Sequence, residues 1–240
     1  MDSVAVLEKP VAEWDWRQRV IEIILAAPEP PAKRKMTYEE FLAWADEDTL
    51  AEWVDGEVVM TSPASYRHQD VRGFLEAVLR PFVEERKLGI VQSAPFQMKL
   101  PGSGREPDLL FVAARHLDRL RRTYLDGPAD LVVEVLSPES AGRDRGEKFY
   151  EYAVGGVPEY WLIDPDAQWA VFYQLGEFGL YEQTLTGREG LYRSAAIPGF
   201  WLRVEWLWQE PLPSALHVLS EIAGIAPQTV EQFIQAMRGP

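Results

Sequence analysis

The stretch from residue 130 to residue 140, DLVVEVLSPES, places an acid inside an aliphatic strand signal. Every residue of Val132–Leu136 is aliphatic except Glu134, a pattern typical of a strand buried on both faces. An ionised carboxylate in that setting must become neutral, pair with a cation or bind a metal. The sequence therefore predicts a cation or a metal beside Glu134.

A second acid opens another aliphatic segment, because REPDLLFV places Asp108 directly after Pro107. Two strands can each present one carboxylate to a shared point, and hard oxygen ligands favour Mg²⁺, with Mn²⁺ as its substitute. Lys148 lies four residues after Asp144 on a predicted helix and can orient a water or stabilise charge that develops on a phosphate. Two acids and a lysine predict metal-dependent hydrolysis.

A simpler interpretation of these residues is structural. A lone strand glutamate is more often half of a buried ion pair, here with Lys148 or an arginine, although Asp108 favours the metal site. Lys148 can equally be a solvated helix lysine paired to Asp144. His68 titrates near neutrality, but a single histidine at a helix start is more often a cap or a packing residue.

The elements predicted around the acids describe an α+β domain, a mixed β-sheet flanked by helices. Thr37 and Glu40 form a capping-box pattern, and the DG of EWVDGEVVMTSP predicts a hairpin turn. Gly89 is expected to end the second helix. The predicted elements are helices at 37–46, 67–87, 142–154 and 214–236, and strands at 90–100, 108–113, 130–136, EYWLID and QWAVFYQ.

Three segments are predicted from composition. Residues 1–35 are an N-terminal helical arm with a Pro-rich linker, residues 36–176 the central domain, and residues 177–240 a C-terminal hairpin and helix extension. Three tryptophans, Trp201, Trp206 and Trp208, exceed what a small extension can easily bury. They predict a homo-oligomer interface, most simply that of a dimer.

Composition bounds the function further. The chain is 47% hydrophobic, which favours a folded protein, and it has no cysteine, which excludes thiolate metal sites and suits the cytoplasm. No apolar run approaches the roughly 18 residues of a membrane span, so no membrane partner is expected. The net charge of −14 opposes broad nucleic-acid binding, so phosphate contacts would come from the clusters PAKRK (31–35) and RHLDRLRR (115–122).

The strings EPDLLFV, DLVVEVLSPES and RDRGEKFYEYAVGGVPEYWLIDP together resemble the Uma-two family of restriction endonucleases, within the PD-(D/E)XK nuclease superfamily. The resemblance extends back to MTYEEFLAWA, EWVDGEVVMTSPAS and His68, so it covers roughly residues 36–175. It implies a restriction-endonuclease-like fold and Mg²⁺-dependent hydrolysis of phosphodiester bonds in DNA.

The resemblance also implies roles for single residues. Asp108 and Glu134 would be the two acids, the carbonyl of Val135 a further metal ligand, and Glu52 the glutamate that an earlier segment contributes. The sequence departs from the pattern at Leu136, where the superfamily has a lysine. Lys148, on the next helix, would replace that lysine.

Two other functions remain open. A nuclease-like fold that lacks turnover and acts as a binding or regulatory module would fit Leu136 and the acidic charge, and metal binding without hydrolysis would select it. Hydrolysis of a small phosphorylated molecule would also fit the charge, but no glycine loop that cradles phosphate is present.

Overall fold

A computed structural model of the chain describes residues 35–45, 49, 51–60, 64–137 and 140–239. Nearly all of the predicted N-terminal arm, residues 1–35, lies outside the described residues. Residues 36–240 form one compact unit. Across the described residues, no helix combines the length and apolar character needed to cross a membrane.

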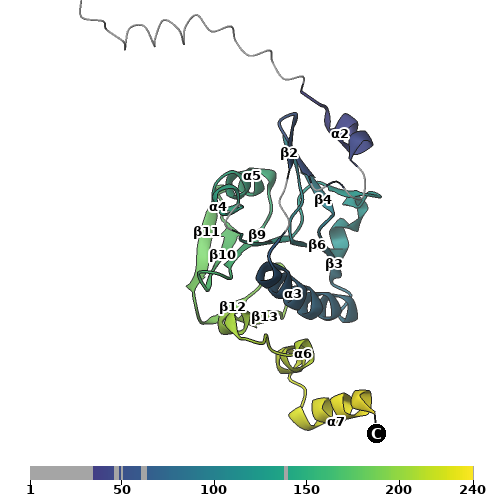
Figure 1. The fold of residues 1–240 in the computed structure, drawn as a ribbon, viewed down its shortest axis with the longest axis vertical. Helices are drawn as coiled ribbons and strands as arrows, with labels where there is room; N and C mark the ends of the chain where they lie inside the picture. The colour runs from purple at the N-terminus through teal and green to yellow at the C-terminus, as the bar shows by residue number, and fades with distance from the viewer. Residues whose placement is uncertain (1–34, 46–48, 50, 61–63, 138–139, 240) are drawn as a thin grey trace, which may run out of the picture. The chain divides into compact units, whose positions relative to one another are not determined.

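The larger of two main sheets has six strands in the order β11-β10-β9-β8-β6-β3 (Figure 1). Only β8 and β9 run parallel among these neighbours. The strands are β3 (Gly89–Ser93), β6 (Leu109–Ala113), β8 (Leu131–Val135), β9 (Glu159–Asp164), β10 (Trp169–Leu175) and β11 (Tyr181–Gly187).

The second sheet has the strand order β2-β1-β5-β4-β7. Its β1–β2 hairpin confirms the prediction from the DG turn, because Asp55 and Gly56 have φ of 47° and 90°, as a type I′ turn requires. The strands are β1 (Ala51–Val54), β2 (Glu57–Met60), β4 (Gln97–Leu100), β5 (Ser103–Arg105) and β7 (Tyr124–Asp126), and a separate pair is formed by β12 (Leu191–Arg193) and β13 (Trp201–Arg203).

Helices cover both faces of the larger sheet. The predicted capping box at Thr37 and Glu40 is confirmed at the first described helix. The helices are α2 (Tyr38–Trp44), α3 (Tyr66–Glu85), α4 (Ala141–Arg145), α5 (Glu147–Gly155), α6 (Ala215–Ala223) and α7 (Pro227–Arg238), with 3₁₀ turns η1 (Ala114–Arg119) and η2 (Val204–Trp208).

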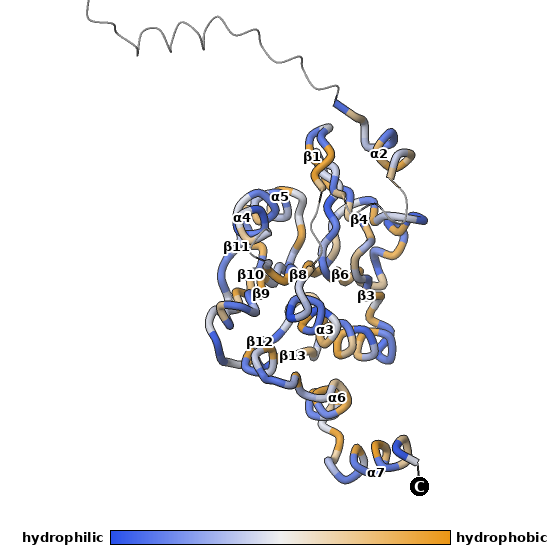
Figure 2. The backbone as a smooth tube through the Cα atoms, in the orientation of Figure 1, coloured by the Kyte–Doolittle hydropathy of each residue, from blue (hydrophilic) through white to orange (hydrophobic). Residues whose placement is uncertain are grey.

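Successive residues of β8 face different cores. Leu131, Val133 and Val135 pack in a core with α3, whereas Val132 and Leu136 pack in a second core with Tyr152 of α5. This explains the continuous aliphatic run, which Figure 2 shows as hydrophobic colouring along the central strands. Glu134 lies between Val132 and Leu136 and therefore faces α5.

Two predicted helices are broken, and one predicted helix end was wrong. The helix expected at 142–154 is two helices, because Gly146 has φ −116° and ψ −87°, and the final helix is broken after Ala223, where Gly224 has φ 69°. Gly89 does not end α3, which stops at Glu85. It begins β3 at φ 153°, where a side chain would collide with the Val112 carbonyl.

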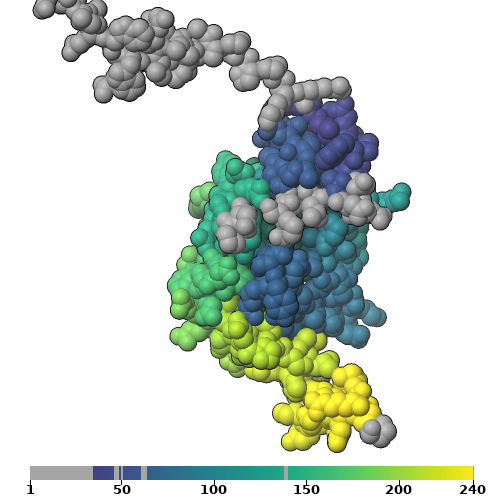
Figure 3. All heavy atoms as spheres, in the orientation of Figure 1, coloured from purple at the N-terminus to yellow at the C-terminus, as the bar shows by residue number. Residues whose placement is uncertain are grey.

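The C-terminal segment packs against α3. Phe200, Leu202 and Trp206 belong to the same core as α3, and Trp201 and Trp208 are partly buried against it. In Figure 3 the yellow-green atoms of this segment border the blue atoms of α3. Trp206 is buried, whereas Trp201 and Trp208 are only partly buried. The homo-oligomer interface expected at these tryptophans stays a prediction, as does a domain boundary at residue 177.

Candidate active site

The two predicted acids lie opposite each other on neighbouring strands. Antiparallel β6 and β8 pair Leu109 with Val133, and continuing this register by one residue places Asp108 opposite Glu134. Opposed residues point to the same face of a sheet, and like charges placed this way destabilise it. The arrangement is therefore costly for folding alone, which favours a functional role.

Glu134 is 2% exposed, and the two hydrogen bonds that its side chain accepts from described residues fall on Oε1. Lys148 Nζ donates to this oxygen at 3.0 Å and the Tyr152 hydroxyl at 2.6 Å. Burial raises the pKa of Glu134 to about 8, although Lys148 opposes the rise, and the nearby acids Asp144 and Asp108 add to it. Without a further cation, this carboxyl is poorly suited to carry its negative charge.

Lys148 lies among three acids. Its Nζ is 3.0 Å from Glu134 Oε1, 3.1 Å from Asp144 Oδ1 and 3.3 Å from Glu52 Oε1. Burial by itself lowers the pKa of Lys148, but the three carboxylates outweigh it and raise that pKa above its usual range. Lys148 therefore stays an ammonium and cannot serve as a base at neutral pH.

The missing lysine at position 136 is explained by the packing of α5. Leu136 shares the face of β8 that Glu134 occupies, and it is 4% exposed among apolar neighbours. The helix that covers this face delivers the Lys148 ammonium to Glu134. A cation thus reaches the acid from α5 instead of from the strand.

Glu52 and Arg105 hold the other side of Lys148. The β1–β5 register places them opposite each other, and Arg105 Nη1 donates to Glu52 Oε2 at 3.0 Å. Glu52 Oε1 accepts from the Glu106 amide at 3.1 Å. Burial raises the pKa of Glu52, but Lys148 and Arg105 outweigh it and lower that pKa. Arg105 also donates twice to Glu151 of α5, at 2.8 and 2.6 Å.

Asp108 is oriented by backbone and by α3. Its Oδ2 accepts from the Val135 amide at 2.7 Å and lies 3.2 Å from His68 Nε2. The His68 amide donates to the Ser65 side chain, which caps α3. His68 is thus part of the helix start, as the structural interpretation held, and it also contacts an acid.

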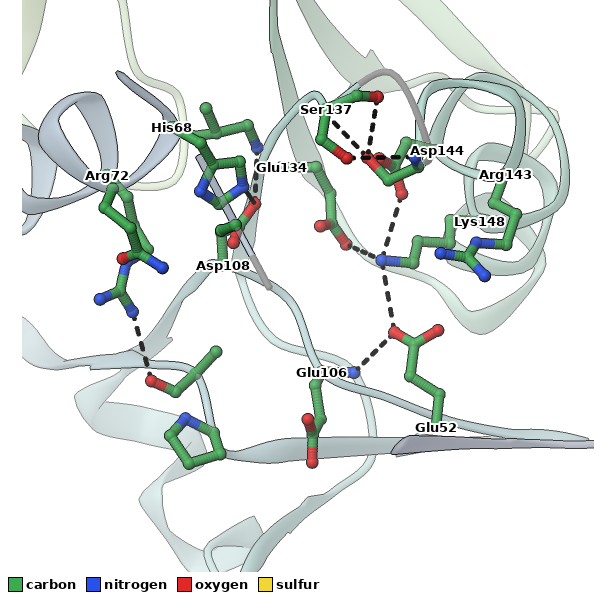
Figure 4. Close-up of a pocket in the computed structure, with 16 residues that line it drawn as sticks. Glu52, His68, Arg72, Glu106, Asp108, Glu134, Ser137, Arg143, Asp144 and Lys148 are labelled. Atoms are coloured by element: carbon green, nitrogen blue, oxygen red, sulfur yellow. Dashed lines mark hydrogen bonds and ion pairs between the residues drawn. The ribbon is translucent and has the colours of Figure 1, made fainter. Parts of the chain in front are cut away.

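A cavity of about 460 Å³ brings the predicted residues together (Figure 4). All six residues expected to act or to pair at the site contribute to its wall. They are Glu52, Asp108, Glu134, Val135, Asp144 and Lys148.

Sequence reasoning missed four residues at or behind this wall: Arg72, Arg105, Arg143 and Tyr152. The Tyr152 position carried a signal, because it lies four residues after Lys148 and so on the same helical face. The others depend on contacts between distant segments. Arg105 and Glu52, for example, become neighbours only through the β1–β5 pairing.

The described residues of the two predicted basic clusters do not line the cavity. RHLDRLRR follows the C-terminal end of β6, whereas Asp108 precedes the other end of that strand, so the segment lies away from the acids. Its arginines pair with nearby acids: Arg115 with Asp130 at 2.7 Å and Arg121 with Asp126 at 3.0 Å. Lys35 is exposed, and the rest of PAKRK lies outside the described residues. Among the described residues, the arginines of the cavity wall are Arg72 and Arg143.

Few groups in the cavity are available to bind a metal ion. Among the described residues, no group of three or more His, Asp or Glu side chains is arranged to hold a metal, since Lys148 lies between Glu52, Glu134 and Asp144. Asp108, Glu134 and the Val135 carbonyl remain. Mg²⁺ is usually bound by one or two carboxylates together with water and substrate oxygens, so these residues fit it.

The raised pKa of Glu134 predicts how stability depends on pH. Without metal, we expect the free energy of unfolding to fall as pH rises from about 4.5 towards 8, because the folded chain keeps a proton that the unfolded chain releases. The slope is at most about 1.4 kcal/mol per pH unit. Urea unfolding in EDTA should show this contribution in the wild type and not in Glu134→Gln.

Glu106, whose pKa burial raises to about 7, titrates in both proteins, so the difference between them isolates Glu134. Parallel pH curves for the two proteins would contradict the raised pKa.

Comparison with known proteins agrees with this geometry. A family model named Uma2, described as "Putative restriction endonuclease", matches residues 38–205. No curated protein matches the chain. The fold is similar to the crystal structure of a "putative nuclease belonging to DUF820" from Anabaena variabilis, at 17% identity and a TM-score of 0.63, covering 72% of this chain and 97% of that one. The predicted α+β, restriction-endonuclease-like fold is confirmed.

Proposed function

We propose, because the chain belongs to the Uma2 family of restriction-endonuclease-like proteins, that it is a Mg²⁺-dependent endonuclease acting on the phosphodiester bonds of DNA. One observation carries this proposal: Asp108 lies opposite Glu134 in one cavity, with the Lys148 ammonium 3.0 Å from Glu134. Two acids and a cation around a space that admits solvent are the parts that phosphodiester hydrolysis requires.

Asp108, Glu134 and the Val135 carbonyl would hold the metal. A bound divalent cation supplies Lewis acidity and lowers the pKa of water. The chain fixes its ligands in advance: the Val135 amide and His68 orient Asp108, and Tyr152 orients Glu134. Burial raises the pKa of Tyr152 well above its usual value, so its hydroxyl stays protonated and donates to Glu134.

Lys148 stays positive and would stabilise negative charge that develops on the phosphate, or orient the attacking water. Glu52 was expected to be a metal ligand. Its contacts support a different role, because its two oxygens already accept from Arg105 and from the Glu106 amide and contact Lys148. We assign Glu52 to the positioning of Lys148.

The proposal is tested with the wild-type protein and metal alone. Supercoiled plasmid and single-stranded circular DNA are incubated with Mg²⁺, with Mn²⁺, and with EDTA. We expect nicking or linearisation with either metal and none in EDTA, and circular substrates show that the attack is internal.

Calorimetry with Mn²⁺ completes this test. If Mn²⁺ binds and no form of DNA or RNA is cut, the endonuclease proposal is wrong and the chain is a metal-binding module with a nuclease fold. If RNA is cut and DNA is not, the substrate part of the proposal is wrong.

A further inference from the structure

Unsatisfied polar atoms gather at the cavity. Of the five buried side-chain atoms that lack a hydrogen-bond partner in the described part of the chain, four belong to residues of the cavity wall. These are His68 Nδ1, Arg72 Nε, Arg143 Nε and Asp144 Oδ1, and the last is compensated by Lys148 at 3.1 Å. Buried polar groups are nearly always paired in folded proteins, so this concentration marks the cavity as a place where a ligand or ordered water would supply the missing partners.

The missing partners are hydrogen-bond acceptors at two of these positions. A guanidinium only donates and remains charged, so Arg72 Nε and Arg143 Nε each call for an anionic or strongly polar oxygen. Arginine matches the geometry of phosphate oxygens. In a chain of net charge −14, two such arginines in an acid-lined cavity favour a phosphate-bearing ligand.

The two arginines approach from different elements. Arg72 lies on the α3 face that also presents His68, and its Nη1 donates to the Ala94 carbonyl at 3.3 Å. Arg143 lies on α4, and its guanidinium forms no hydrogen bond or ion pair with the described residues. Figure 4 draws them on opposite sides of Asp108 and Glu134.

We propose that Arg72 and Arg143 bind the phosphates on either side of the scissile phosphodiester, so that the site selects an internal bond of a nucleic-acid strand. This inference rests on the proposed function and names the substrate class of that same site. Because the two arginines lie on opposite sides of the acids, a strand with a phosphate on each side would give each guanidinium its own partner. The arrangement therefore favours such a strand over a phosphomonoester or a mononucleotide.

Four short ligands separate the contributions. The dinucleotide dTpdT has one internal phosphodiester, pdTpdT and dTpdTp add a terminal phosphate at one end, and pdTpdTp carries both. Binding is measured by calorimetry in the Glu134→Gln protein, where no cleavage is expected. We expect pdTpdTp to bind most tightly, and each arginine to account for one terminal phosphate.

In that background, Arg72→Ala and Arg143→Ala should each weaken pdTpdTp binding roughly 10- to 100-fold, as for the loss of a charge-assisted hydrogen bond. Each variant should lose its response to one terminal phosphate and keep its response to the other. Binding of dTpdT should not change, a result that a merely structural role would not give. The lysine variants should bind pdTpdTp more tightly than the alanine variants, because they keep the charge.

Arg122→Ala is the matched control, since Arg122 is exposed, belongs to RHLDRLRR and lies outside the cavity. A loss there as large as in the cavity variants would overturn the proposal, as would equal losses for dTpdT and pdTpdTp. If Arg72→Ala and Arg143→Ala each cut plasmid as fast as the wild-type protein, this inference is refuted and the endonuclease proposal is not. The expected binding pattern in a protein that cuts nothing refutes the endonuclease and leaves only the binding of two strand phosphates by Arg72 and Arg143.

Discussion

Glu134→Gln and Asp108→Asn should each lower DNA cleavage by at least about 10³-fold and remove detectable Mn²⁺ binding. The two carboxylates lie opposite each other across β6 and β8, and Glu52 and Asp144 of the same cavity already contact Lys148, so these two acids are not free to take their place. Electrostatic stabilisation by a bound cation contributes several kcal/mol to such reactions, and each 1.36 kcal/mol is a tenfold change in rate. Plasmid cleavage and calorimetry measure the two effects.

Asp70→Asn is the matched control for these variants. It makes the same charge change on α3, where Asp70 pairs with Arg67 at 3.6 Å and does not line the cavity. Thermal melting in EDTA adds a second criterion, because removing one of several crowded acids relieves repulsion and should not destabilise the protein. Unchanged Mn²⁺ binding in both cavity variants would contradict the site, and a marked fall in melting temperature would favour a purely structural ion pair.

Much of the frame could be predicted from local signals. The capping box at Thr37 and the DG turn are set by neighbouring residues, and the aliphatic run of β8 reports burial on both faces. The breaks at Gly146 and Gly224 were not predicted, because a single glycine is tolerated inside a helical pattern, and at Gly224 apolar residues recur on both sides. The presence of a helix was therefore easier to predict than the places where it is interrupted.

The site was only half predictable for a physical reason. Asp108 and Glu134 stand out because a charged carboxylate beside aliphatic strand residues is energetically unfavourable, and this can be recognised from the sequence alone. Arg105 has no such conflict: its importance comes from Glu52, which only the sheet pairing brings to it. The same holds for Arg72 and Arg143, which read as ordinary surface arginines until the cavity shows which atoms lack partners.

Lys148→Ala should lower cleavage by about 10² to 10⁴-fold at saturating Mg²⁺ while metal binding is retained or strengthened. A positioned cation near the reacting phosphate contributes on this scale, and loss of the ammonium removes repulsion against the incoming metal ion. The variant should also be less stable without metal, by up to about 3–5 kcal/mol, because three buried carboxylates lose their shared partner. Metal should restore part of that stability, since it replaces the missing charge.

Leu136→Lys in the Lys148→Ala background separates catalysis from stability. Leu136 shares the face of β8 with Glu134, so a lysine there returns an ammonium to the acids along the route that the superfamily pattern uses. We expect partial recovery of cleavage together with a further loss of stability, because position 136 is 4% exposed among apolar side chains. Lys99→Ala, which removes a lysine paired with Glu39 outside the cavity, controls for net charge. A loss of only a few-fold in Lys148→Ala, measured on folded protein saturated with metal, would show that Lys148 holds the acids together without taking part in hydrolysis.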